Sequence, residues 1–293
     1  MSPLTIVATI LVSTLRSTTP LLLGALGGIF SERAVVVNIA LEGIMLTGAW
    51  AAVYVSFLTG SALAGVLGAV VAGVLVSAIH AVTSIQFKAN QVVSGVAINS
   101  FASGFTEFML VKVWNAGQSP SVSKVPDIGQ INLFVLIAFA LTFVAQFALF
   151  RTPWGLRLRS VGEHPLAAET TGVNVYRMQY WGVLLSGLFA GLAGASLSIG
   201  LVSRFNTGMT AGRGFIALAA MIFGRWNPVG AMWATLLFGF ADAIGVFFQI
   251  LGVSVPAQFL TMSPYVITML ALAGVIGRSV PPAADGIPYE KKH

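Results

Sequence analysis

Between Arg33 and Lys88 the chain reads AVVVNIALEGIMLTGAWAAVYVSFLTGSALAGVLGAVVAGVLVSAIHAVTSIQF, residues 34–87, and Glu42 is its only Asp, Glu, Lys or Arg. A membrane-spanning helix needs about 20 predominantly apolar residues, so this stretch can hold two. The whole chain has 293 residues, of which 57% are hydrophobic and 8% are charged. Soluble domains carry about 25% charged residues. The composition therefore indicates a polytopic membrane protein and argues against a soluble enzyme.

Other charge-poor stretches continue this pattern. Residues 128–150 and 178–203 carry no charge, and Asp242 is the only charged residue in 226–277. We predict one all-α transmembrane domain over 1–293, with about 8–9 hydrophobic segments of spanning length or shorter. The run 214–224 is too short to cross at about 1.5 Å per residue, which predicts a half-helix or a re-entrant segment. The predicted spans are a helix broken near Pro20 over 4–30, and then 35–58, 62–84, 91–112, 131–150, 181–203, 228–250 and 259–277.

The charged residues gather at the edges of the apolar segments. The net charge is +6, and cytoplasmic loops of membrane proteins carry an excess of Lys and Arg. We therefore predict that 151–180 and the C-terminal tail are cytoplasmic and that 113–130 lies on the opposite side. The excess of basic residues then sets the orientation of the protein in the membrane and does not indicate nucleic-acid binding. In this arrangement Arg204 and Arg213 lie on the side opposite the cytoplasm, contrary to the usual excess of Lys and Arg in cytoplasmic loops.

The sequence offers little for metal or enzyme chemistry. It has no cysteine, and its three histidines, at positions 80, 164 and 293, are too scattered to suggest a metal site. It also lacks the Gly-x-x-x-x-Gly-Lys-Ser/Thr pattern that binds ATP phosphates. An intramembrane enzyme would need a nucleophile and a base paired at membrane depth, and the sequence suggests no such pair. We predict no catalytic residue, no metal and no cofactor in this chain.

Several polar side chains lie inside the predicted spans, where a carboxylate costs about 2.5–3.5 kcal/mol. Asn38 and Glu42 are four residues apart and share a helix face, as do Asn99, Ser103 and Glu107. One interpretation is a pathway for a polar solute, beside which an aromatic ring stacks on a flat ligand. The alternative is hydrogen bonding between helices, without contact to the solute. The predicted pathway residues are Asn38, Glu42, Trp50, Asn99, Asp242 and Gln249.

A faint internal repeat links the two halves of the chain. Residues 39–46, IALEGIML, are echoed by residues 216–223, IALAAMIF, and each copy is followed closely by a Gly and a Trp. Transporters built from inverted repeats have interrupted helices at corresponding places and a substrate site near the midplane. The repeat fits that architecture, although short apolar words also match by chance.

Residues 160–172, SVGEHPLAAETTG, predict a short capped helix in the cytoplasmic stretch. Pro165 suits the first helical position, and Gly172 suits the residue just past the end. Such a helix between two spans is either a lever for a soluble partner or an ordinary loop helix.

Five stretches together resemble one family of proteins. They are TPLLLGALGGIFSER (19–33), VNIALEGIML (37–46), VGEHPLAA (161–168) with Gly172, GLAGA (191–195) and PPAADGIPY (281–289). They resemble the inner-membrane permeases of ABC importers related to the branched-chain amino acid and ribose permeases. Within that family the chain is most similar to the smaller permease of nucleoside importers that work with basic-membrane-protein lipoproteins. The resemblance spans nearly the whole chain, and His164 departs from it, because Asn is more usual there.

The resemblance implies a bacterial inner-membrane subunit that moves nucleosides by alternating access. The implied partners are a second homologous permease, a cytoplasmic ABC ATPase that hydrolyses the ATP, and a substrate-binding lipoprotein or periplasmic protein. The solute is implied to be a small molecule, and the chain to be surrounded by membrane lipid. A permease for sugars or amino acids, and a secondary transporter that moves protons through Glu42 or Asp242, stay open as alternatives. The residues implied to couple to the ATPase are Gly162, Glu163, Pro165, Ala167, Ala168 and Gly172.

Overall fold

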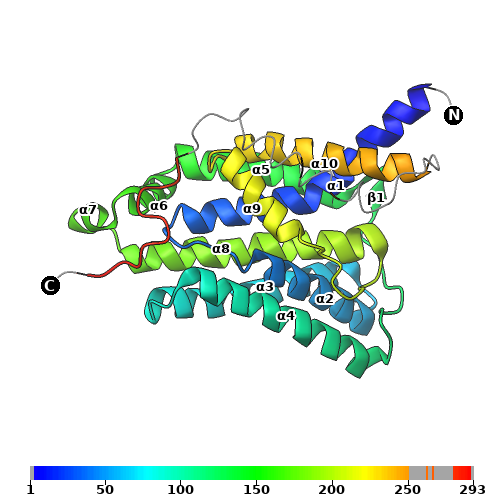
Figure 1. The fold of residues 1–293 in the computed structure, drawn as a ribbon, viewed down its shortest axis with the longest axis horizontal. Coiled ribbons are helices and arrows are strands. Elements are labelled where there is room, and N and C mark those ends of the chain that lie inside the picture. Colours follow the sequence, from blue (N-terminus) through cyan, green and yellow to red (C-terminus); the bar gives the residue numbers. More distant parts are fainter. Residues whose placement is uncertain (1–2, 251–261, 263–265, 267–279, 292–293) are drawn as a thin grey trace.

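The computed structural model describes residues 3–250, 262, 266 and 280–291, which form a helical bundle with one short β-hairpin (Figure 1). Six of these helices are long and apolar enough to cross a membrane, which confirms the prediction of an all-α, multi-pass protein. The predicted span over 259–277 lies almost entirely outside the described residues. The elements are α1 Pro3–Glu32, α2 Leu41–Thr59, α3 Ala62–Ala81, α4 Gln91–Trp114, β1 Asp127–Ile128, β2 Ile131–Asn132, α5 Leu133–Arg151, α6 Pro153–Glu163, α7 Pro165–Thr170, α8 Val175–Ala195, α9 Arg213–Phe223 and α10 Pro228–Ile250. Two π-helical segments, η1 Val82–Gln86 and η2 Ser196–Val202, continue α3 and α8.

The first helix differs from its prediction. α1 runs without interruption from Pro3 to Glu32 and contains Pro20, so the predicted break near this proline is wrong. Proline removes one backbone N–H, but helices that span membranes tolerate it, because neighbouring helices and local adjustments satisfy the freed carbonyl. Here α1 packs against α8, α9 and α10, and these three contacts hold its middle in place.

The real interruption lies further along, between α1 and α2. The predicted span over 35–58 begins too early, since residues 33–40 are not helical and α2 starts at Leu41. Val35 adopts a left-handed φ of 77° there. The other predicted half-helix is confirmed, because α9 is only 11 residues long. α2 and α9 start beside each other inside the bundle and run in opposite directions, as the two halves of an inverted repeat would.

The two ends of the bundle differ in charge and in the segments they carry. α6, α7 and the C-terminal tail gather at one end, and β1 lies at the other (Figure 1). Because the first end holds most of the Arg and Lys residues in the described ranges, we assign it to the cytoplasm. Its ion pairs join Lys88 to Glu290 (2.9 Å), Arg33 to Glu163 (3.8 Å) and Lys291 to Glu169 (3.5 Å).

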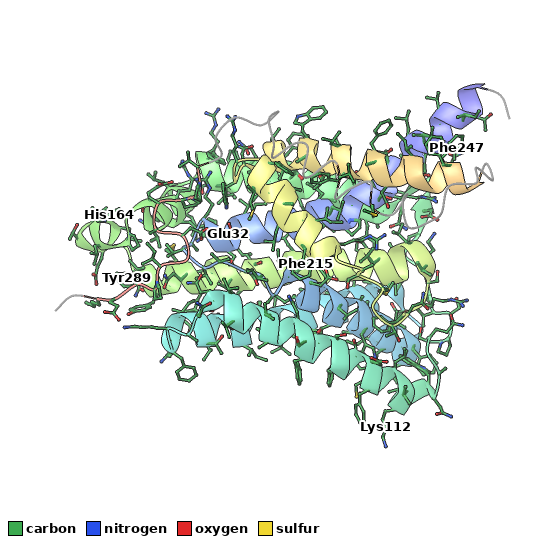
Figure 2. All side chains as sticks on the ribbon, in the orientation of Figure 1. Glu32, Lys112, His164, Phe215, Phe247 and Tyr289 are labelled. Atoms are coloured by element: carbon green, nitrogen blue, oxygen red, sulfur yellow. The ribbon has the colours of Figure 1, made fainter. Side chains whose placement is uncertain are left out.

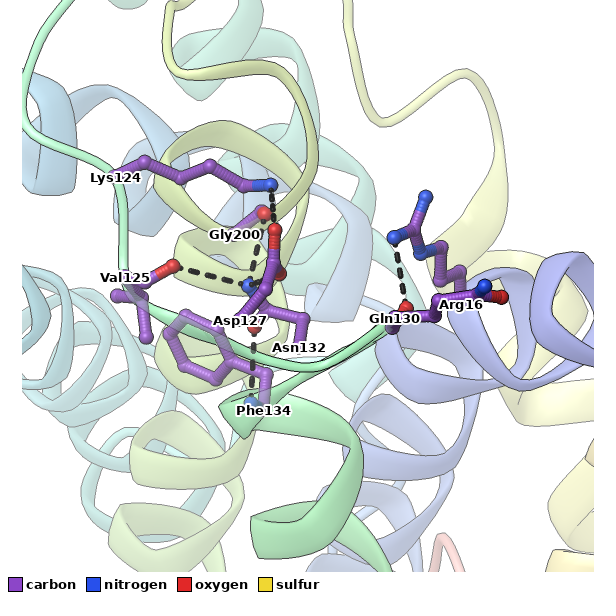
Figure 3. Close-up of polar contacts among 8 residues, drawn as sticks. All are labelled: Arg16, Lys124, Val125, Asp127, Gln130, Asn132, Phe134 and Gly200. Carbon is purple, nitrogen blue, oxygen red and sulfur yellow. Dashed lines mark hydrogen bonds and ion pairs between the residues drawn. The ribbon is translucent and has the colours of Figure 1, made fainter.

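At the opposite end the β-hairpin fastens three helices together (Figure 3). The side-chain amide of Asn132, just before α5, donates to Asp127 Oδ1 at 2.8 Å and to the carbonyl of Gly200 beyond α8 at 3.2 Å. Arg16 of α1 donates to the carbonyl of Gln130 at 2.8 Å. The loop over 113–130 is therefore anchored to α1, α5 and α8.

Glycines allow the backbone of α8 to lie in direct contact with the backbones of neighbouring helices. A Cβ added at Gly191 would meet the carbonyl of Ala69 on α3, and one added at Gly187 would meet the carbonyl of Gly73 at 2.5 Å. On α2, a Cβ at Gly48 would lie 2.9 Å from the Cα of Gly191. Small residues at helix crossings let backbones pack closely in lipid, and here they bind α8 to both α2 and α3.

We predict opposite effects of one added methyl group at two helical glycines. Gly191→Ala should lower thermal stability, because overpacking against backbone costs about 1–3 kcal/mol. Gly104→Ala on α4 is the control, since a Cβ there meets nothing within 4 Å. It should stabilise the helix by about 0.5–1 kcal/mol, the difference between Gly and Ala. The measurement is the melting temperature of each purified variant in detergent, and equal shifts would contradict the proposed packing.

Candidate functional site

The interruption between α1 and α2 is organised around the carboxylate of Glu42. This residue lies in the first turn of α2, and its two oxygens accept hydrogen bonds from the start of α9. Oε1 accepts from the Gly212 N–H at 2.8 Å, and Oε2 accepts from the Gly214 N–H at 2.6 Å. The first N–H groups of a helix have no partner within it, and its N-terminus carries partial positive charge. The carboxylate thus caps the start of α9, and its negative charge lies in the first turn of α2.

Asn99 of α4 contacts the start of α2 from the side opposite α9. Its Oδ1 accepts from the Gly43 N–H at 2.7 Å, and its Nδ2 donates to the Ile39 carbonyl at 2.9 Å. α2 has no capping side chain of its own, so a neighbouring helix supplies the cap. The absence of a side chain at Gly43 allows this approach, because a Cβ there would lie 2.9 Å from the Cα of Asn99.

Asn38 completes the group, and it is fully buried. Its Nδ2 donates to Ser186 Oγ of α8 at 2.8 Å, while its Oδ1 has no partner among the described residues. The structure therefore brings three of the predicted pathway residues, Asn38, Glu42 and Asn99, to the interruption. Each forms a hydrogen bond to a neighbouring segment of the bundle, and Glu42 and Asn99 are also partly exposed.

The other predicted pathway residues lie elsewhere. Asp242 of α10 accepts from Ser17 Oγ at 2.7 Å, on the seam between α10 and α1. Trp50 of α2 stacks on Tyr54 with ring centroids 4.8 Å apart, inside an apolar cluster. Gln249 lies near the end of α10, and its side chain is outside the described part. These three are not part of the group at Glu42.

The predicted cytoplasmic helix is present as α7, with the expected ends. Pro165 occupies its first position, and Gly172, two residues past its end, has a left-handed φ of 85°. His164 Nδ1 accepts from the Ala167 N–H at 3.1 Å, the capping role that Asn commonly fills. Figure 2 places His164 at the outer tip of the cytoplasmic end of the bundle.

The predicted coupling residues divide into two groups by exposure. Glu163, Ala167 and Gly172 are exposed, and Pro165 is half-buried. Gly162 and Ala168 are buried instead. Their contribution is to the packing of α6 and α7 on the bundle.

Sequence reasoning missed a junction that joins α6, α1 and the tail. A Cβ at Gly162 would lie 2.5 Å from the Arg33 carbonyl, so the end of α6 rests directly on the backbone of Arg33. The Gly162 carbonyl accepts from the Ala284 N–H at 3.0 Å, and the Val35 carbonyl accepts from the Gly286 N–H at 3.1 Å. The tail thereby connects α6 to the non-helical segment before α2. The stretches 19–33, 161–168 and 281–289 all carry the family resemblance, but the sequence did not predict that they meet.

A second contact at this junction holds the far end of α9. Arg33 donates from Nε and Nη2 to the Trp226 carbonyl, at 3.2 and 3.0 Å. The Trp226 indole N–H donates to Glu32 Oε2 at 2.6 Å, in a buried position. α9 is therefore held at its start by Glu42 and just beyond its end by Glu32 and Arg33. These contacts flank the 33–40 segment on both sides.

Two titratable groups of the tail are shifted by their surroundings. Burial raises the pKa of Asp285 from 3.8 to about 6. Burial, and then the neighbouring Glu169, raise the pKa of Tyr289 to about 12. The tail is therefore packed against the bundle at both residues.

A multi-pass helical protein with interrupted helices and a short helix at its cytoplasmic end fits the architecture of a transport permease. The chain matches the family described as branched-chain amino acid transport system / permease component over residues 10–276, and it belongs to that family. It is 43% identical to the guanosine ABC transporter permease protein NupQ of Bacillus subtilis, over 98% of each chain. It is 41% identical to the nucleoside ABC transporter permease protein NupC of Lactococcus lactis, over 93% of this chain and 94% of that one.

A further relative, the guanosine ABC transporter permease protein NupP of Bacillus subtilis, is 28% identical over 77% of this chain and 70% of its own length. NupP and NupQ come from one organism, and both are named guanosine ABC transporter permease proteins. The family resemblance stated from the sequence is thus confirmed, and the chain is a multi-pass permease subunit for which the bacterial plasma membrane is a fitting location.

We predict that Glu42→Gln destabilises the chain. Glutamine keeps one acceptor oxygen but turns an amide donor toward a second donor, so one buried N–H of α9 loses its partner. Such a loss costs about 1–3 kcal/mol. Thermal melting in detergent measures it, with Glu107→Gln as the control, because Glu107 is exposed and has no ion pair or hydrogen bond within the described ranges. Equal melting temperatures for both variants would contradict the role given to Glu42.

Proposed function

We propose that this chain is one of two permease subunits in an ATP-driven importer that carries nucleosides. The observation that supports it most is the near-complete alignment with NupQ and NupC, whose names state guanosine and nucleoside transport. The second permease is supported by the occurrence of NupP beside NupQ in one organism. A cytoplasmic ATPase supplies the energy, and a lipid-anchored or periplasmic protein delivers the solute.

Force from the ATPase enters through α7 and the exposed residues Glu163, Ala167 and Gly172. It reaches the membrane through the contact between Gly162 and Arg33, since that contact joins backbone to backbone. Arg33 then acts in two directions, along the chain into the 33–40 segment and across to the Trp226 carbonyl after α9. A tilt of α6 and α7 therefore moves the start of α2 and the end of α9.

The solute passes the interruption, where Asn38, Glu42 and Asn99 offer amide and carboxylate groups. A ribose needs such hydrogen-bond partners, and a base needs a flat apolar slot, for which Trp50 is the proposed ring. When α2 and α9 separate, Glu42 loses the Gly212 and Gly214 N–H groups, and a ribose hydroxyl replaces them as donor. Asp242 and Gln249 remain pathway candidates along α10. The chain needs no cofactor of its own for this cycle.

Uptake by the assembled complex tests this function. The chain is purified from its own membrane with its partners and placed in liposomes that contain ATP, and uptake of labelled guanosine is measured with excess ribose or leucine as competitors. We expect ATP-dependent uptake that neither competitor reduces, and loss of the co-purified ATPase when 163–171 is deleted. Uptake by this chain alone, driven by a proton gradient and indifferent to ATP, would establish a secondary transporter instead.

We predict that Gly162→Ala uncouples ATP hydrolysis from transport. The added methyl group displaces α6 from the Arg33 carbonyl while the exposed surface of α7 stays unchanged. The ATPase should therefore still co-purify and hydrolyse ATP, while uptake per ATP falls several-fold. Ser160→Ala, on the same helix, is the matched control and should keep the wild-type ratio. Loss of the ATPase from the Gly162→Ala complex would show a docking role rather than a transmitting one.

A further inference from the structure

A pocket that contains two arginines and two tryptophans lies between α6 and α8, at the cytoplasmic end of the bundle (Figure 1). Its volume is about 450 Å³, and its lining residues are Trp154, Arg157, Arg177, Met178, Trp181 and Leu185. The first two come from α6 and the other four from α8. This pocket is separate from the interruption around Glu42 and from the exposed residues of α7.

The pocket lies where the bundle leaves the membrane. α5 is long and apolar enough to span and ends at Arg151, and α6 begins directly after it, at Pro153. α8 is also long and apolar enough to span, and it begins at Val175. Trp154 and Arg177 therefore lie within one turn of the cytoplasmic ends of two spans. Tryptophan is enriched at membrane–water interfaces, and arginine on their cytoplasmic side.

The polar groups of the pocket are all hydrogen-bond donors. Guanidinium and indole groups donate and have no acceptor atom, and the described residues that line the pocket include no Asp or Glu. Arg157 and Arg177 are exposed, and within the described ranges neither side chain forms an ion pair or a hydrogen bond. Two unpaired positive charges thus face one pocket. A phosphate group fits them, because a guanidinium can donate two parallel hydrogen bonds to its oxygens.

The α8 side of the pocket changes from charged to apolar toward the membrane interior. Arg177, Trp181 and Leu185 follow one another at steps of four and therefore share a face of the helix. Leu185 lies about 12 Å along the helix from Arg177, and Trp181 between them is exposed by 46%. A soluble phosphate would contact only the charged end of this face. A phospholipid matches the whole of it, with its phosphate at the arginine and its acyl chains along the leucine.

We propose that this pocket binds the headgroup of an anionic phospholipid from the cytoplasmic leaflet of the membrane. Arg157 and Arg177 hold the phosphate from two different helices, and the indole N–H groups of Trp154 and Trp181 donate to its glycerol and ester oxygens. Basic pockets between membrane helices on the cytoplasmic side suit such headgroups. Because α6 leads directly into α7, the bound lipid braces the coupling region against α8. The site goes beyond the proposed function and does not depend on which solute is carried.

Binding of defined lipids to the purified protein tests the site. The full-length chain, with the partners that it retains in detergent, is stripped of lipid and titrated with dioleoyl phosphatidylglycerol or with zwitterionic dioleoyl phosphatidylcholine. Native mass spectrometry counts the bound lipids. We expect one tightly bound phosphatidylglycerol that phosphatidylcholine does not match. Arg157→Gln and Arg177→Gln should each weaken its binding about ten-fold, since each removes a charged donor from the phosphate.

Arg151→Gln is the matched control, because Arg151 is exposed at the same end of the bundle and does not line the pocket. It should keep the wild-type affinity for phosphatidylglycerol. The melting temperatures of all three variants in phosphatidylcholine should equal that of the wild type, since neither pocket arginine has a side-chain partner in the described part of the chain. Weaker binding then reports the pocket and not a loss of folding.

Several outcomes would overturn the proposal. Equal binding of the two lipids would show that the pocket does not select a negative headgroup, and an equal loss of affinity in Arg151→Gln would show a general effect of surface charge. Glycerophosphoglycerol, the same headgroup without acyl chains, should not displace the lipid at equal concentration; if it does, the pocket is a site for soluble anions. Loss of a co-purified ATPase from Arg177→Gln, with lipid binding unchanged, would make the pocket a protein contact.

Discussion

The carboxylate of Glu42, held between the starts of α2 and α9, is the contact on which the arrangement of this protein depends. Two helix N-termini placed side by side inside a membrane bring together partial positive charges and N–H groups without partners. Neither can be left unsatisfied where there is no water. Glu42 accepts from Gly212 and Gly214 and also lies in the first turn of α2, so one side chain makes the pairing of two interrupted helices stable.

From this contact the connection to the cytoplasm follows. The short helix α9 is held at its start by Glu42 and just past its end by Glu32 and Arg33, which bind Trp226. Glu32 and Glu42 lie on either side of the non-helical 33–40 segment, and Arg33 is its first residue. α6 and the tail rest on that same segment, so in the proposed mechanism a displacement at the cytoplasmic end passes through these polar contacts to α2 and α9. Three of the few charged residues of this chain thus lie where α1, α2 and α9 meet.

The sequence predicted the spans well and the interruption poorly. Long uncharged stretches mark helices by composition alone, and Pro165 with Gly172 marked α7 by local chemistry. Residues 35–40 fall in the predicted span 35–58, because the group that caps the true start of α2 is distant in sequence: Asn99 of α4 accepts from the Gly43 N–H. The break predicted at Pro20 is wrong for the converse reason. Proline disfavours a helix locally, but the helices packed around α1 keep it continuous.

The same logic explains why spacing did not separate pathway residues from structural ones. Glu42, Asp242 and Glu107 look alike in sequence, each an isolated acid in an apolar run. In the fold, Glu42 joins two helix ends, Asp242 accepts one hydroxyl on a helix seam, and Glu107 has no partner in the described residues. A bonded acid lowers the energy of the arrangement that contains it, and breaking its hydrogen bonds costs free energy. Helical periodicity reports only the face on which an acid lies, so the hydrogen bonds of the fold, rather than spacing, distinguish an acid that joins two helices from one that does not.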